Sequence, residues 1–139
     1  MVYRLGILHQ QIIQEVEQID NPIEALQTVL VLTLQYFRVH QGLIKLFFMQ
    51  IGYGDTVATQ QLFKTRQNYR NILENILQKG IIEGAFLPLE VLDMEIAINS
   101  IIGTINWTLY DLLVVRNENI ELEKLATKLS AHIMRSLLQ

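Results

Sequence analysis

Apolar residues along this chain recur every three or four positions rather than every two, which is the spacing of one face of a helix. Between residues 3 and 19, Leu5, Leu8, Ile12, Val16 and Ile19 fall on one face and glutamines occupy the other. Strand patterns are weak throughout the chain. The sequence therefore predicts an all-α bundle of about six helices, over residues 3–19, 22–39, 43–51, 55–78, 88–115 and 119–137.

Capping residues and glycines mark the predicted helix boundaries. Asn21 can cap the helix that starts at Pro22, a position where the missing N–H of proline is no loss. The glycines of IGYGD end the short helix over residues 43–51, and KGIIEGAFLP links two long helices. Asn119 can cap the last helix. No repeat or interdomain linker interrupts this series, so residues 1–139 are expected to form a single domain.

The helix predicted over residues 88–115 is apolar nearly all round, so it must be covered on most faces. Its length suits a membrane span, but Glu95, Asn99, Asn106 and Asp111 lie within or beside the apolar run. We therefore expect a helix that is central in the bundle or shared with a partner, and no membrane contact.

Composition excludes several classes of site. The chain has no cysteine and three scattered histidines, so neither a disulfide framework nor a metal site is expected, and no cofactor is predicted. Eleven basic and fourteen acidic residues give a net charge of -3, which argues against nucleic-acid binding by this chain alone. The first residues lack the uninterrupted apolar stretch of a signal peptide. A cytoplasmic location is expected.

Enzyme chemistry finds no support in the sequence. It contains no Ser-His-Asp spacing, no HExxH and no glycine-rich phosphate loop, and IGYGD lacks the lysine and the following serine or threonine of a P-loop. No catalytic residue is predicted.

The link QKGIIEGAF, the proline-started helix after it and the segment GTINWTLYDLL resemble the C-terminal half of TetR-family (tetracycline-repressor-like) transcriptional regulators. The resemblance covers essentially the whole chain. It implies an effector-binding and dimerisation domain whose last two helices, here 88–115 and 119–137, pair with those of a second subunit in a four-helix bundle. The family's helix-turn-helix half has no counterpart before residue 3, so the chain is either a fragment of a longer regulator or a protein without that half.

Several residues are candidates for a ligand site. Asn99 and Asn106 share a helix face with Gly103, whose missing side chain leaves space, and Trp107 and Tyr110 lie close by. Arg66 and Tyr69 fall on the inward face of the preceding long helix, and an inward cation needs a partner. The remaining candidates, from the short aromatic helix, are Phe47 and Phe48.

Two readings of these candidates stay open. They either bind a small apolar ligand, with Arg66 as counter-ion if that ligand is acidic, or serve packing alone, with Arg66 at the rim or paired with Glu95. Packing alone would leave a helical interaction module without a small-molecule ligand.

A homodimer is expected through the last two helices. The small residues Ala97, Ser100, Thr104 and Thr108 form a stripe that permits close approach of another helix. The predicted apolar centre of the interface consists of Leu109, Leu112, Leu129 and Ile133.

Overall fold

The computed structural model describes residues 2–40, 57–116 and 118–138, and every regular element in these ranges is a helix. The all-α prediction is confirmed. The predicted helix over residues 43–51, with Phe47 and Phe48, lies outside the described residues. The elements are α1 (Val2–Val16), α2 (Pro22–Val39), α4 (Val57–Ile82), α5 (Val91–Leu109), the π-helical turn η1 (Tyr110–Val115) and α6 (Leu122–Arg135).

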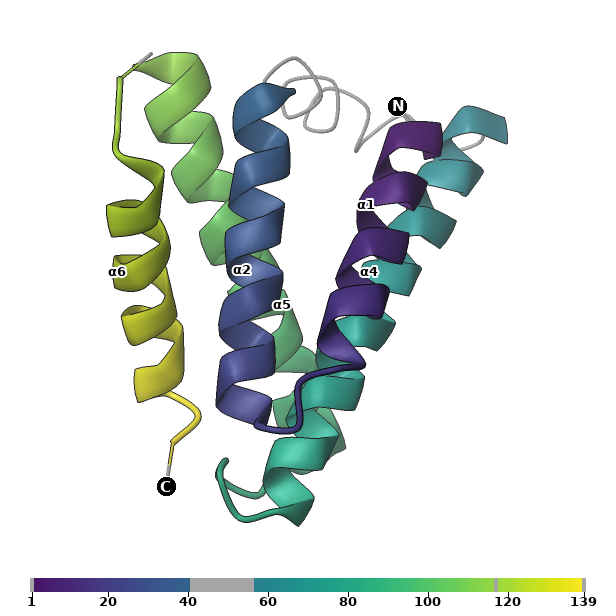
Figure 1. The fold of residues 1–139 in the computed structure, drawn as a ribbon. Coiled ribbons are helices and arrows are strands. Elements are labelled where there is room, and N and C mark those ends of the chain that lie inside the picture. The colour runs from purple at the N-terminus through teal and green to yellow at the C-terminus, as the bar shows by residue number, and fades with distance from the viewer. Residues whose placement is uncertain (1, 41–56, 117, 139) are drawn as a thin grey trace.

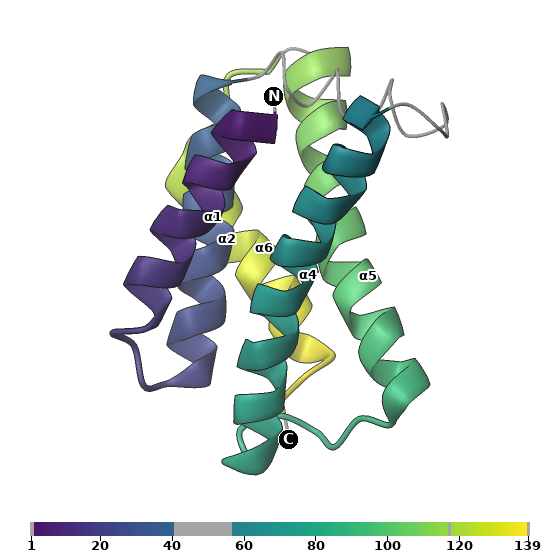
Figure 2. The ribbon, with the colours of Figure 1, turned by 90° about the vertical axis from the view of Figure 1, so that its right-hand side faces the viewer.

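Neighbouring helices run up and down, and α2 lies in the middle of the bundle (Figure 1). It contacts α1, α4, α5 and α6, while α1 and α4 pack against each other on one side (Figure 2). The apolar faces predicted from the sequence meet in one core. Its most deeply buried large side chains are Leu8, Ile12, Leu26, Leu30, Leu34, Leu73, Leu77, Phe86, Ile98, Ile105 and Leu109.

Local hydrogen bonds explain where the helices begin and end. The Asn21 side chain accepts hydrogen bonds from the backbone N–H groups of Ile23 and Glu24, as the capping pattern predicts. The last helix begins later than predicted, at Leu122, because Asn119 accepts a hydrogen bond from the Arg38 guanidinium on α2 instead of capping it. Likewise α5 begins at Val91 rather than at Pro88, after a capping box between Glu90 and Asp93.

The link between α4 and α5 is fixed by one close contact. A Cβ atom on Gly80 would lie 2.0 Å from the ring of Phe86, so the fully buried ring packs directly on the glycine backbone. Gly84 turns the chain with φ of 81°, a conformation that favours glycine. The backbone N–H of Leu87 then donates to the carbonyl of Leu137 at 2.7 Å, which ties the link to the segment after α6.

The continuous helix Val91–Val115 is long and apolar enough to cross a membrane, a property that core helices of soluble proteins share. Its buried side chains, from Met94 to Leu113, lie in the common core, and it contacts α2, α4 and α6.

Candidate functional site

A small polar cluster interrupts the apolar core where α1, α2 and α4 meet. His9 on α1 is 6% exposed, and its ring lies 5.7 Å from the ring of Tyr69 on α4. The hydroxyl oxygens of Tyr69 and Thr33 on α2 are 2.8 Å apart. Thr33 donates its own proton to the carbonyl of Val29 at 2.7 Å, so Tyr69 is the donor in the Tyr69–Thr33 hydrogen bond. These three side chains therefore connect three helices.

Burial keeps the cluster neutral near pH 7. Loss of solvation lowers the pKa of His9 from 6.5 to about 4. It also raises the pKa of Tyr69 from 10.0 to about 12, against a smaller lowering by the hydrogen bond with Thr33. The imidazole and the phenol are thus both uncharged in the folded protein.

Two nitrogen atoms in this region are buried without a hydrogen-bond partner, Nδ1 of His9 and Nε of Arg66. Arg66 lies one helical turn before Tyr69, so the two side chains share a face of α4. None of the carboxylates that the structure describes forms an ion pair with Arg66. Buried polar atoms are normally satisfied, so these two nitrogens mark the candidate site in the described chain.

The cluster and Arg66 together comprise two of the predicted site residues and two that sequence reasoning missed. Arg66 and Tyr69 are inward, as predicted, whereas His9 and Thr33 were not singled out. A usable signal existed for His9, because Ile12, Ile13 and Val16 follow it at three, four and seven positions and place it on an apolar face.

Asn99 has a different role from the predicted one. It is exposed, and its side-chain oxygen accepts a hydrogen bond from the guanidinium of Arg70. Arg70 also contacts the Glu95 carboxylate at 2.5 Å, so Arg70 and not Arg66 is the partner of Glu95. Asn99 therefore helps to join α4 and α5.

The other predicted ligand residues of α5 lie toward the outside of the described chain. Trp107 is 62% exposed and stands edge-on to Tyr110 with ring centroids 6.0 Å apart. A side chain at Gly103 would meet no atom within 4 Å. Asn106 and Tyr110 are half-buried. The structure therefore does not gather these residues with Arg66 and Tyr69 in one enclosed wall.

Most residues predicted for the apolar centre of the dimer interface are buried within their own chain. Leu109, Leu129 and Ile133 are only 1%, 6% and 4% exposed, because they pack in the core of their own chain. Leu112 is half-buried. The three core side chains offer little surface to a second copy, whereas Leu112 keeps part of its surface free for such a contact.

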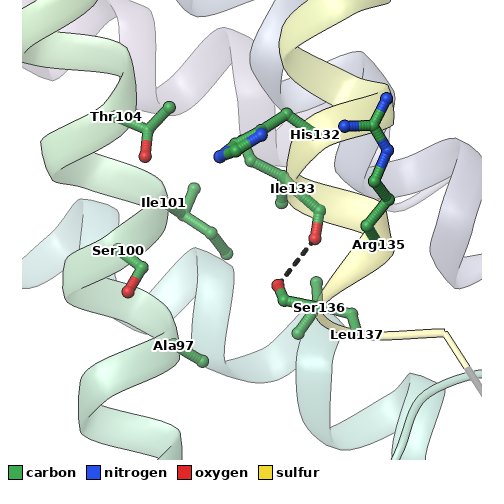
Figure 3. Close-up of a pocket in the computed structure, with 9 residues that line it drawn as sticks. All are labelled: Ala97, Ser100, Ile101, Thr104, His132, Ile133, Arg135, Ser136 and Leu137. Atoms are coloured by element: carbon green, nitrogen blue, oxygen red, sulfur yellow. Dashed lines mark hydrogen bonds between the residues drawn. The ribbon is translucent and has the colours of Figure 1, made fainter.

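A groove of about 440 Å³ lies between α5 and α6. Thr104 and Ile101 on α5 face His132 and Ile133 on α6 across it (Figure 3). The Ser136 hydroxyl near its end donates to the carbonyl of Ile133 at 2.8 Å. The α5 wall contains the small residues of the predicted stripe, Ala97, Ser100 and Thr104.

Comparison with known proteins supports a single family. A family described as "Tetracyclin repressor-like, C-terminal domain" matches residues 20–110. No curated protein sequence matches the chain.

Two solved structures share the fold. The fatty acid degradation regulator FadR from Bacillus halodurans is 17% identical with a TM-score of 0.78, over 96% of this chain and 70% of that one. A TetR/AcrR-family transcriptional regulator from Thermobifida fusca is 14% identical with a TM-score of 0.65, over 94% and 68%. The chain belongs to the tetracycline-repressor-like regulators and matches their C-terminal domain.

Proposed function

We propose that this chain is the effector-binding and dimerisation domain of a TetR-like transcriptional regulator, in which a small apolar ligand alters DNA binding by the intact regulator. The observation that carries the proposal is the pair of unpartnered buried nitrogens, on His9 and Arg66, in an otherwise apolar bundle. Leaving a buried polar atom unsatisfied costs about 1–3 kcal/mol, and a ligand that hydrogen-bonds to these atoms removes that cost.

The position of the cluster supports a signalling role. His9 belongs to α1, whereas Tyr69 and Thr33 belong to α4 and α2, so a ligand at the cluster would contact three helices at once. If the ligand binds one arrangement of α1 more tightly than another, it shifts the population toward that arrangement. In an intact regulator, α1 is the element next to the DNA-binding half.

Dimerisation is proposed through the outward face of α5 and the groove beside α6. From Ile96 to Tyr110 the sequence contains no charged residue, and Ile96 and Trp107 are exposed. Such a face favours burial against another protein surface, and Ala97, Ser100 and Thr104 let a helix approach closely. A second copy of the chain supplies two helices of matching length by two-fold symmetry.

Sedimentation of two variants, each with one glycine replaced, tests the proposed dimer. Gly103→Arg places a long cation on the uncharged face, at a position where an added Cβ atom meets no atom within 4 Å in its own chain. Gly6→Arg is the matched control, because Gly6 lies in α1 and also has no atom within 4 Å of an added Cβ. We expect wild type and Gly6→Arg to sediment as dimers at micromolar concentration and Gly103→Arg as a folded monomer. A monomeric wild type, or a dimeric Gly103→Arg, would contradict the proposed interface.

Ligand binding is tested by thermal unfolding with a panel of fatty acids, aromatic acids and neutral hydrophobic drugs. Fatty acids belong in the panel because one protein of similar fold is a fatty acid degradation regulator. A true effector at one hundred times its Kd stabilises the folded state by about 2.7 kcal/mol. A dimer that responds to no compound would favour the alternative, a helical interaction module without a small-molecule ligand.

We further propose that the protein is not an enzyme, acts in the cytoplasm and contacts DNA only through a separate domain. The first point is supported by the two proteins of similar fold, both of which are regulators.

A further inference from the structure

Arg66 differs from the other arginines whose contacts the structure describes, because its Nε atom is buried without a hydrogen-bond partner. Arg70, one turn later on α4, contacts Glu95 and Asn99, and Arg116 contacts Asp111 and Glu118. Arg66 is half-buried and has no carboxylate partner in the described chain. A partly buried cation without an anion is expensive, so the site is incomplete as it stands.

The unused hydrogen-bonding groups point to the chemistry of the missing partner. Nε of Arg66 is a donor only, and neutral His9 can donate from Nδ1. The Tyr69 hydroxyl proton is already used in the bond with Thr33, so Tyr69 offers no free donor. Two free donors and one unbalanced positive charge require an acceptor that carries negative charge.

We propose that His9, whose ring lies beside Tyr69, and Arg66, one turn before Tyr69 on α4, form a recognition site for the anionic head group of an amphipathic ligand, with a carboxylate on an apolar chain as its simplest form. The inference rests on the proposed function, since it assigns a ligand class to the effector site proposed above. It also adds His9, on α1, as a residue that senses the head group. One carboxylate that accepts from both donors joins α1 to α4 directly.

The test compares one chain length with two head groups. Binding of decanoate, decanol and acetate to the full chain is measured by isothermal titration calorimetry. We expect decanoate to bind at least tenfold more tightly than decanol, and acetate to bind much more weakly than decanoate because it lacks the apolar part.

Three variants assign that preference to the site. Arg66→Gln should weaken decanoate about 10- to 100-fold and leave decanol unchanged, which is the range for a hydrogen bond to a charged group. His9→Gln should weaken decanoate to a smaller extent. Lys64→Gln is the matched control, since Lys64 is an exposed cation two residues before Arg66 on the same helix, and it should change nothing.

A second measurement covers the case in which Arg66→Gln fails to fold. In wild-type protein, the imidazole ¹⁵N signals of His9 should shift on addition of decanoate and stay unmoved with decanol, and those of exposed His132 should not respond to either.

Equal affinities for decanoate and decanol, both unaffected by Arg66→Gln, would overturn the proposed recognition of an anionic head group. The proposed effector function would not be affected by that result. Acetate binding as tight as decanoate would overturn the amphipathic part. Absence of binding by both ten-carbon compounds would overturn this inference, and the wider panel described above then decides the effector function separately.

Discussion

Gly80 shows how a single hydrogen atom in place of a methyl group can determine the fold of a link. Gly80→Ala should destabilise the protein by about 1–3 kcal/mol, because its Cβ would meet the buried Phe86 ring at 2.0 Å and the core must shift. Gly6→Ala, also in a helix but with no atom within 4 Å, should instead stabilise by about 0.5–1 kcal/mol. Urea unfolding of the two variants checks both signs, and a loss of stability in Gly6→Ala would contradict the argument.

His9 makes stability depend on pH. The pKa of His9 falls from 6.5 to about 4 on burial, so the unfolded chain binds a proton between these values while the folded protein does not. The contribution of neutral His9 to the free energy of unfolding is therefore complete above about pH 6.5 and is lost as the pH falls toward 4. Between pH 6.5 and 4.5, wild type should lose about 2 kcal/mol more than His9→Leu, measured by urea unfolding. Parallel pH profiles of the two proteins would show that His9 is not buried in its neutral form.

At the residue scale, the sequence identified the inward cation but not its surroundings. The spacing of apolar residues on α4 places Arg66 and Tyr69 inward, and the structure agrees. Arg66 and Arg70 are four residues apart, so periodicity alone cannot decide which of them reaches Glu95 on α5. That choice depends on the relative positions of two helices, which local pattern does not encode.

At the element scale, the contribution of an ion pair to stability depends on how deeply the pair is buried, as the contact between α4 and α5 shows. Arg70 is 13% exposed and contacts Glu95 and Asn99, whereas Arg116 is 53% exposed and forms two surface ion pairs. Arg70→Gln should cost about 1–2 kcal/mol, and Arg116→Gln less than about 0.5 kcal/mol despite its two partners. Thermal unfolding of the two variants tests this order, and a larger loss in Arg116→Gln would reverse it.

The helices were predictable to within a few residues, because their caps and periodicity are local. Asn21 and Pro22 start α2 as expected. Asn119 was misassigned as a cap since its actual partner, Arg38, lies 81 positions earlier in the chain. The same limit applies to Leu109, Leu129 and Ile133. An amphipathic face shows that a residue is buried, but not whether its own chain or a partner buries it.

At the scale of the whole molecule, charge sets what this chain can bind. With eleven basic and fourteen acidic residues, its net charge is -3, and neutralising phosphates requires the opposite balance. In a gel-shift assay at low salt, submicromolar protein should retard duplex DNA no more than an acidic globular protein of similar size. A retardation that weakens as salt is added would reveal a DNA-binding surface on this domain.

The position of α6 beside α2 affects how the chain folds during translation. The N–H groups of Arg38 and Leu87 bond to the carbonyls of Ile120 and Leu137, and α6 leaves the ribosome after every other helix described. Until α6 has been synthesised, the side of α2 that it covers remains exposed to solvent in the nascent chain. Pairings this distant in sequence slow folding and prolong the exposure of apolar surface. Synthesis that pauses before residue 122 should therefore yield a species that chaperones retain and that aggregates when released.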